Sequence, residues 1–151
     1  MTAQRGFTLI ELLVVMTILG ILSGLSLLKL RDLRYAAVAA QMTQELRAVQ
    51  VAAFNYFADH ETWPLETGPG AVPAGLAPLL PAQLTSSFDR GEYVLDYENF
   101  GGTGEVVIGV SVTSSNERLF AKFAQFLGKG SPFFIAGNTI TYLISGPGGI
   151  F

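Results

Sequence analysis

The 151-residue sequence contains no cysteine and little charge, and both absences exclude classes of function. Without cysteine the chain has no disulfide, no thiol nucleophile and no cysteine-ligated metal. Charged residues make up 14% of the chain, and the formal net charge is −3. Because no five or six like charges follow one another, the sequence offers no basic stretch for nucleic acid. The length suits one domain.

Patterns for catalysis and nucleotide binding are also missing. No Gly-x-Ser-x-Gly motif occurs, and the glycines of residues 101–105 lack phosphate-loop spacing, so we expect a hairpin turn there. The single histidine, His60, stands beside Asp59 and Glu61. A metal site needs three or four ligands, so a solvated turn residue is the favoured interpretation of His60. The sequence therefore predicts no enzyme.

Hydrophobic residues make up half of the chain and are concentrated near its start. Residues 7–28 reach the length of about 20 apolar residues that a membrane-spanning helix needs. An ordinary signal peptide has a shorter apolar core followed by a cleavage site. Residues 37–39 have the Ala-x-Ala form, but they lie beyond four charged residues, so we do not expect cleavage there. We predict a transmembrane helix over residues 7–28.

Glu11 is the exception inside this apolar segment. An acidic side chain near the middle of a membrane costs about 2.5–3.5 kcal/mol on insertion scales and usually marks a partner or a functional site. Glu11 lies only four residues into the segment, so it could also reach the interface or take up a proton. From the residues alone, a functional acid and a tolerated one both stay open.

The residues around Glu11 read Gly-Phe-Thr-Leu-Ile-Glu-Leu-Leu and resemble the processing motif of type IV pilins and of type II secretion pseudopilins. The shared features are a short leader that ends in glycine, then phenylalanine, then glutamate four residues later. The resemblance implies that a prepilin peptidase removes residues 1–6 by cutting between Gly6 and Phe7, and methylates the new amino group of Phe7. It also implies that Glu11 meets this amine in a neighbouring subunit, and such a pair is tolerated where a lone buried carboxylate is not.

The same resemblance implies the location and the partners of the chain. These are the inner membrane with an exported C-terminal domain, then a periplasmic or extracellular filament of pilin subunits, an inner-membrane platform protein and an assembly ATPase. Only Arg5 precedes the apolar segment, whereas Lys29, Arg31 and Arg34 follow it. The positive-inside rule alone would therefore place the C-terminal side in the cytoplasm. We follow the leader motif because the rule is statistical.

Residues 29–59 are predicted to continue the helix in amphipathic form. Apolar residues recur there at steps of three and four: Tyr35, Val38, Met42, Leu46, Val49, Ala53 and Tyr56. No proline interrupts the chain before residue 64, so one helix from Phe7 to about Ala58 would be roughly 80 Å long. Gly20 and Gly24 either allow close helix packing or only loosen the helix, and both interpretations stay open.

After Trp63-Pro64 the sequence predicts a connector over residues 60–92 and a sheet region over residues 93–151. The connector is rich in proline and glycine but too apolar for a free linker. Three stretches of β-branched and aromatic residues are predicted strands, at residues 93–97, 106–112 and 139–144. Residues 116–128 are predicted to form a helix, with Ser114 and Glu117 at capping-box spacing and Gly128 as the C-terminal cap.

The predicted fold class is therefore α+β and pilin-like. Its long N-terminal helix packs on a small antiparallel sheet, and one short helix is added. Four acidic residues could hold calcium, which prefers six to eight oxygen ligands: Asp89, Glu92, Asp96 and Glu98. Major pseudopilins bind calcium in a C-terminal loop, but no acidic residue follows Glu117 here. Without calcium-loop spacing, a solvated face is favoured for the four acids, and no cofactor is expected.

These observations favour a filament subunit over a binding protein or an enzyme. A type II secretion pseudopilin is the favoured form, since the chain has no cysteines for the disulfide-closed loop of many pilins and has a short domain. The alternative is a type IV pilus pilin, major or minor, including a competence pilin for DNA uptake. Nucleic acid is not an expected partner, because the cations of the exported region are scattered: Arg47, Arg90, Arg118, Lys122 and Lys129.

Overall fold

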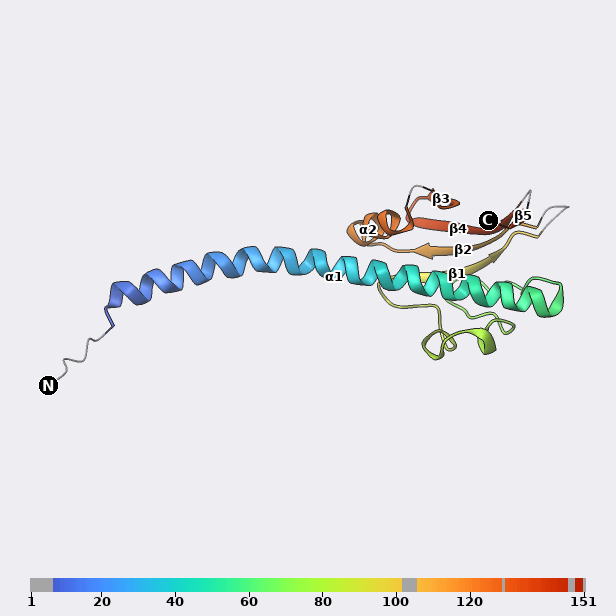
Figure 1. Cartoon of the computed structure of the whole chain (residues 1–151), viewed down its shortest axis with the longest axis horizontal. Coiled ribbons are helices and arrows are strands. Elements are labelled where there is room, and N and C mark those ends of the chain that lie inside the picture. The colour runs from blue at the N-terminus through green and yellow to red at the C-terminus, as the bar shows by residue number, and fades with distance from the viewer. Residues whose placement is uncertain (1–6, 102–105, 129, 147–148, 151) are drawn as a thin grey trace. The chain divides into compact units, whose positions relative to one another are not determined.

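The structure is a computed structural model that describes residues 7–101, 106–128, 130–146 and 149–150. Figure 1 labels its helices and strands, whose bounds are α1 Leu9–His60, β1 Val94–Asn99, β2 Ile108–Thr113, α2 Glu117–Leu127, β3 Phe133–Ala136, β4 Thr139–Gly146 and β5 Gly149–Ile150. The chain divides into two compact units, Met1–Tyr35 and Ala36–Phe151. The observed elements confirm the α+β class, with one long helix, an antiparallel sheet and one short helix.

In the first unit, the start of α1 exposes its apolar side chains. The side chains described between Phe7 and Arg34 are all exposed. Two hydroxyls bond to the helix backbone: Thr17 donates to the Val14 carbonyl at 2.7 Å, and Ser26 donates to the Leu22 carbonyl at 2.9 Å. Such internal bonds satisfy polar groups that would otherwise be costly in an apolar surrounding.

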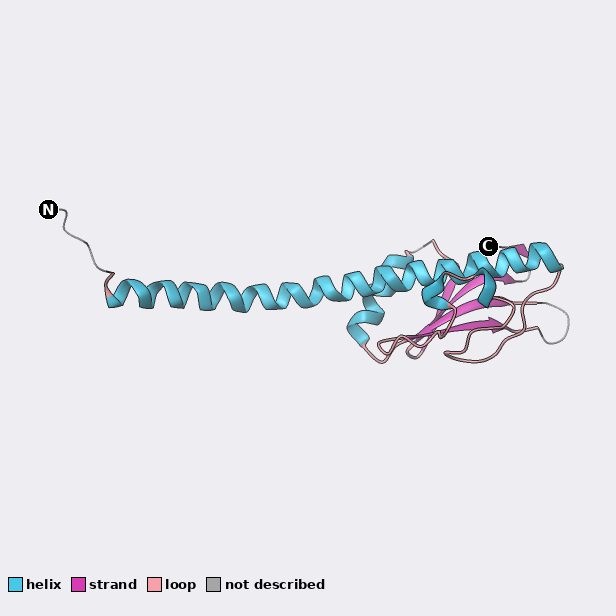
Figure 2. Cartoon of the chain, turned by 90° about the horizontal axis from the view of Figure 1, so that it is seen from below, coloured by secondary structure: helices cyan, strands magenta, loops and turns pink. Residues whose placement is uncertain are grey.

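In the second unit, the rest of α1 packs through the predicted stripe. Met42, Leu46, Val49 and Ala53 are all at most 1% exposed. Their spacing places them on one face of the helix, and α1 lies along the sheet with this part (Figure 2). Burial of four such side chains, rather than helix propensity alone, fixes this part of the helix to the domain.

The sheet has the strand order β1-β2-β4-β3, with β5 paired to β4, and every pair is antiparallel. Successive residues of a strand point to opposite faces. One face carries the buried register set Leu95, Val112 and Ile140. The opposite face carries Asp96, Ser111 and Thr141, and the two hydroxyls lie 2.8 Å apart.

The sheet contains two strands that the sequence interpretation did not predict, β3 and β5. The signal for β3 was present: four apolar residues follow Pro132 and precede a Gly137-Asn138 turn, in which Gly137 has φ 62°. The three predicted strands exist with shifted ends. The hairpin turn predicted at residues 101–105 falls mostly on residues 102–105, which lie outside the described residues.

The cap of α2 corrects one sequence prediction. Asn116, not Ser114, is the N-cap, because its side-chain oxygen accepts from the Arg118 and Leu119 amides at 3.2 Å. The Ser114 hydroxyl instead donates to the Glu92 carbonyl at 2.8 Å, joining the start of α2 to the turn before β1. Two residues of the segment could cap a helix, and spacing alone selected the wrong one. Gly128 is the C-cap, as predicted, with φ 78°.

The connector between α1 and β1 is packed rather than free. Leu76, Leu80, Leu84 and Phe88 are buried, and the short 3₁₀ helices Ala77–Leu79 and Ala82–Leu84 lie among them. A Cβ atom at Gly75 would come within 2.7 Å of the Tyr56 ring, so the connector passes too close to α1 for a larger residue.

Candidate functional site

The first candidate site is the start of α1, which holds two of the predicted site residues. Phe7 is 76% exposed and precedes the helix, and Glu11 is an exposed residue of its first turn. The Thr8 hydroxyl accepts from the Glu11 amide at 3.3 Å and lies 3.5 Å from the Glu11 carboxylate. Gly6 and the leader residues 1–6 lie outside the described residues.

Thr8 and Glu11 give Glu11 a local role that the sequence interpretation missed. Their spacing is that of a capping box, and the threonine half is present: the Thr8 hydroxyl satisfies the Glu11 amide, while the Glu11 carboxylate faces that hydroxyl. A carboxylate in the first turn also opposes the partial positive charge of the helix start, an effect of about 0.3–1 kcal/mol. The local role leaves the carboxylate exposed, so it can still accept a cation from another molecule.

The apolar surface that follows Glu11 has the composition of a membrane span. An 18-residue window of α1 has a mean hydropathy of 2.2, and none of the window is buried. Gly20 and Gly24 have open space around them, with no atom within 4 Å of a Cβ built at either position. A shallow groove of about 490 Å³ runs along the same surface between Leu19 and Leu30. This surface can take apolar partners.

Comparison with known proteins finds a match in the same N-terminal segment. A family model described as the prokaryotic N-terminal methylation motif matches residues 1–27. The chain carries the signature of type IV pilins and pseudopilins. The signature implies processing by prepilin peptidase and assembly into pilin filaments, and with the apolar helix it is consistent with membrane anchoring. No curated protein and no solved structure matched the chain.

A second glutamate, Glu45, is buried in the second unit. It is 5% exposed, and it accepts from the Tyr93 hydroxyl at 2.7 Å and from Arg90 Nε at 3.2 Å. Gln41 donates to its other oxygen at 3.0 Å. Burial is the main cause that raises the pKa of Tyr93 above its usual range, and the hydrogen-bonded Glu45 carboxylate is the second cause.

The sequence interpretation missed Glu45, although a signal was present. Glu45 lies three residues after Met42 and one before Leu46, so it adjoins the apolar stripe. An acid in that position needs a partner once the helix is buried. Its cationic and phenolic partners, Arg90 and Tyr93, come from the turn before β1, 45 and 48 residues away.

The four predicted calcium ligands have separate surroundings. Asp89 accepts from the Gly91 amide at 2.8 Å within a turn, and Glu92 is exposed. Asp96 and Glu98 share the polar face of β1, where Glu98 accepts from Ser111 at 2.9 Å. Within the part of the chain that the structure describes, no three His, Asp or Glu side chains form a group that could hold a metal ion. The expectation that the chain holds no cofactor stays a prediction.

For Asp96, the solvated face that the sequence favoured for the four acids is wrong. It is 8% exposed, and its Oδ1 atom is buried without a hydrogen-bond partner. Burial, reinforced by the nearby carboxylates of Glu98 and Glu66, raises the pKa of Asp96 to about 7. Glu66 is fixed nearby, since it accepts from the Asn99 amide at 3.0 Å. Asp96 therefore changes charge near neutral pH.

His60 ends α1 as an exposed residue. Its Nδ1 atom lies 3.0 Å from the Tyr56 carbonyl oxygen, and its ring stacks on Tyr56 with centroids 4.1 Å apart. A ring nitrogen and one ring face are thus involved in local contacts of the helix end. These contacts are with Tyr56, one turn earlier in the same helix.

Proposed function

We propose that the chain is a structural subunit of a type IV pilus-like filament, and specifically a type II secretion pseudopilin. The observation that carries this proposal is the N-terminal methylation motif, which opens into a helix whose described apolar side chains are exposed as far as Leu33. Apolar surface of this extent needs lipid or other subunits to cover it. Its role is structural, not enzymatic.

The order of events follows from the residues at the start of α1. Before processing, residues 7–28 anchor the chain in the inner membrane. Prepilin peptidase then cuts after Gly6 and methylates Phe7, which creates a cationic amine at the start of the helix. In a filament, Glu11 of one copy accepts a hydrogen bond from the Phe7 amine of its neighbour. A platform protein and an assembly ATPase would supply the force for extension.

Three features support a pseudopilin over the alternative, a type IV pilus pilin of major, minor or competence type. The chain has no cysteine to close a C-terminal loop. Its second unit is short. Its α1 is followed by a Trp63-Pro64 corner, where Trp63 stacks on Phe57 with centroids 4.5 Å apart. Complementation separates the two: restored secretion in a strain without its major pseudopilin supports the proposal, and restored surface pili alone support the alternative.

The processing step has a direct test. In a host that has prepilin peptidase, we expect the intact mass of residues 7–151 with one added methyl group, and a sequenced N-terminus at Phe7. The same gene in a host without the peptidase serves as the control and should keep residues 1–6. A full-length mass in the peptidase-positive host would refute the proposal.

A further inference from the structure

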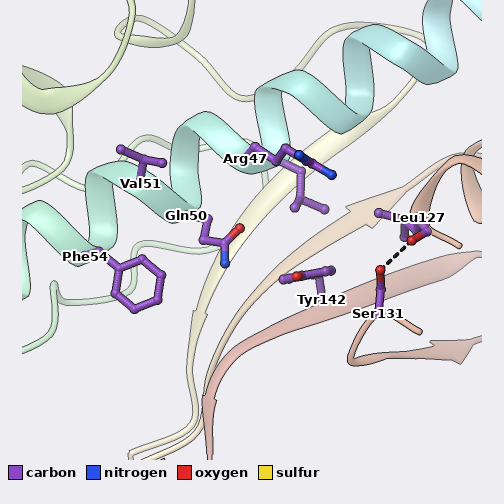
Figure 3. Close-up of a pocket in the computed structure, with 8 residues that line it drawn as sticks. Arg47, Gln50, Val51, Phe54, Leu127, Ser131 and Tyr142 are labelled. Atoms are coloured by element: carbon purple, nitrogen blue, oxygen red, sulfur yellow. Dashed lines mark hydrogen bonds between the residues drawn. The ribbon is translucent and has the colours of Figure 1, made fainter. Parts of the chain in front are cut away.

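A groove opens beside α1 in the second unit, and we call it the Arg47 groove. Its volume is about 420 Å³, and its lining residues are Leu46, Arg47, Gln50, Val51, Phe54, Leu127, Ser131 and Tyr142. Figure 3 shows side chains of α1 on one wall and those of α2, β4 and the segment between them on the other. The Ser131 hydroxyl bonds to the Leu127 carbonyl across the end of α2 (Figure 3).

The lining of the groove suits an apolar group with an acidic neighbour. Val51 is 56% exposed although it is β-branched and apolar. Among the lining residues that the structure describes, Arg47 is the charged one and is exposed, and none is acidic. The Ser131 hydroxyl already has its partner, so an apolar side chain can enter without leaving that group unpaired.

The same unit carries a second feature of opposite character, which we call the acidic corner, residues 59–66. Its three acids, Asp59, Glu61 and Glu66, are exposed, and it contains no lysine or arginine. Leu65, between them, is 84% exposed, the highest value for a large apolar side chain described in this unit. An apolar side chain exposed among acids matches the composition that the groove would accept.

The acidic corner is held rigidly. Glu61 has φ 56°, and its amide closes the helix on the Phe57 carbonyl at 2.8 Å. Asn99 donates to the Pro64 carbonyl at 3.0 Å, and its amide donates to Glu66 at 3.0 Å. A side chain presented on a fixed turn loses little conformational freedom when it binds.

We propose that the Arg47 groove binds the acidic corner of a second copy of this chain, with Leu65 in the groove and Glu61 facing Arg47. The inference deepens the proposed function, on which it rests, by assigning a contact between exported domains. Opposite charges and a matching apolar group select this occupant. In a filament, a second copy is also the partner at the highest local concentration.

The position of the two features along α1 gives the contact a direction. Gln50 lies ten residues before the end of α1 at His60, which is about 15 Å along the helix axis. Copies that leave the same membrane run in the same sense, so the contacting copies are shifted by about that distance. The contact joins two different surfaces, is therefore heterologous, and repeats from copy to copy without closing. A filament grows from such a contact.

The absence of native cysteine makes the contact testable by disulfide cross-linking of the full-length chain. The variant carries Val51→Cys and Leu65→Cys, and it is oxidised mildly in producing cells. We expect a ladder of dimers, trimers and larger species on a denaturing gel. Each single variant should give dimers at most, because a ladder needs both surfaces. The matched control replaces Leu65→Cys by Thr85→Cys, another exposed position, and should give no ladder.

Charge exchange provides the second arm. Arg47→Glu in the Val51→Cys, Leu65→Cys background should reduce the ladder at least tenfold, and adding Glu61→Arg should restore it. Filaments are imaged in the same samples. Filaments without a ladder, or a ladder that Arg47→Glu leaves unchanged, would overturn this contact and leave the proposed function intact. Loss of both filaments and ladder in the cysteine pair, with filaments also absent from the unmodified chain, would overturn both proposals.

Discussion

Glu11 and Glu45 lie on one helix and beside apolar residues, yet their surroundings are opposite. Glu45, in the second unit, is 5% exposed and is bonded to Tyr93, Arg90 and Gln41 of its own chain. Glu11, in the first unit, is exposed, and the hydrogen bonds described for its side chain and amide go to Thr8 alone. A buried carboxylate needs a hydrogen-bonded or cationic partner. Glu45 has its partners within the chain, and the proposed function supplies one for Glu11 from another copy.

The apolar side chains of the two units differ in the same way as the two glutamates: many of those in the second unit are buried, and those described in the first as far as Leu33 are exposed. In the second unit the helix stripe, the connector leucines and the inner face of the sheet cover one another. In the first unit, the described side chains from Phe7 to Arg34 stay exposed. Both units present apolar helix surface, and the difference lies in whether the chain brings a covering layer to it.

Among the substitutions that test the contrast between Glu11 and Glu45, we expect Glu11→Ala to have the largest effect, a loss of assembly. Removing one partner of a buried ion pair costs about 3–5 kcal/mol. The yield of assembled filament should therefore fall at least about a hundredfold, while membrane insertion and the folding of the second unit stay normal. Filaments sheared from cells and quantified against the membrane fraction give the measurement.

A matched variant separates the two roles of Glu11. Glu11→Gln keeps the shape of the side chain and a hydrogen-bond acceptor for Thr8, but it removes the charge. We expect assembly to fail as in Glu11→Ala. Normal filaments from Glu11→Gln would show that helix capping, not pairing with an amine, is what the residue contributes.

Glu45→Ala should lower the stability of the second unit, whereas Glu11→Ala should impair assembly. The free-energy change should be smaller for Glu45→Ala. This substitution removes the acceptor of the Tyr93 hydroxyl and of Arg90 Nε, while Arg90 still donates to the Gln83 carbonyl and keeps 20% of its side chain exposed, so we expect a loss of about 2–3 kcal/mol. The single tryptophan, Trp63, reports urea unfolding of the second unit by fluorescence. The exposed neighbour Gln44→Ala is the control. An unchanged midpoint for Glu45→Ala would contradict the assigned role.

Asp96 is a second buried acid of the second unit, and unlike Glu45 it should make the free energy of unfolding depend on pH. Its pKa of about 7 in the folded chain lies above the usual value of 3.8, so the charged form destabilises the fold. The free energy of unfolding should fall as the pH rises from about 4 to 7 and level off above. Between pH 5 and pH 8 we expect about 1–3 kcal/mol of loss that Asp96→Asn lacks. The free energy of unfolding of the unmodified chain and of Asp96→Asn is measured against pH by Trp63 fluorescence, and parallel curves would contradict this prediction.

Local patterns predicted much of the fold and of the first site. The helical period identified α1 and its buried stripe, and the order of residues around Glu11 identified the motif. Where prediction failed, the competing residue was near: Asn116 caps α2 in place of Ser114, and the Thr8 hydroxyl as acceptor of the Glu11 amide was overlooked. The strand β3 was missed because four residues give too short an alternation to register as a period.

The sequence by itself determined what depends on neighbours along the chain: the apolar segment, the unbroken helix and the glutamate four residues after Phe7. Only the tertiary structure decided which distant residues meet. It brought Arg90 and Tyr93 to Glu45, placed β4 between β2 and β3, and buried Asp96 beside Glu66 and Glu98. The physical reason is that period and composition describe one segment at a time, whereas pairing between segments depends on how they cover one another's apolar faces.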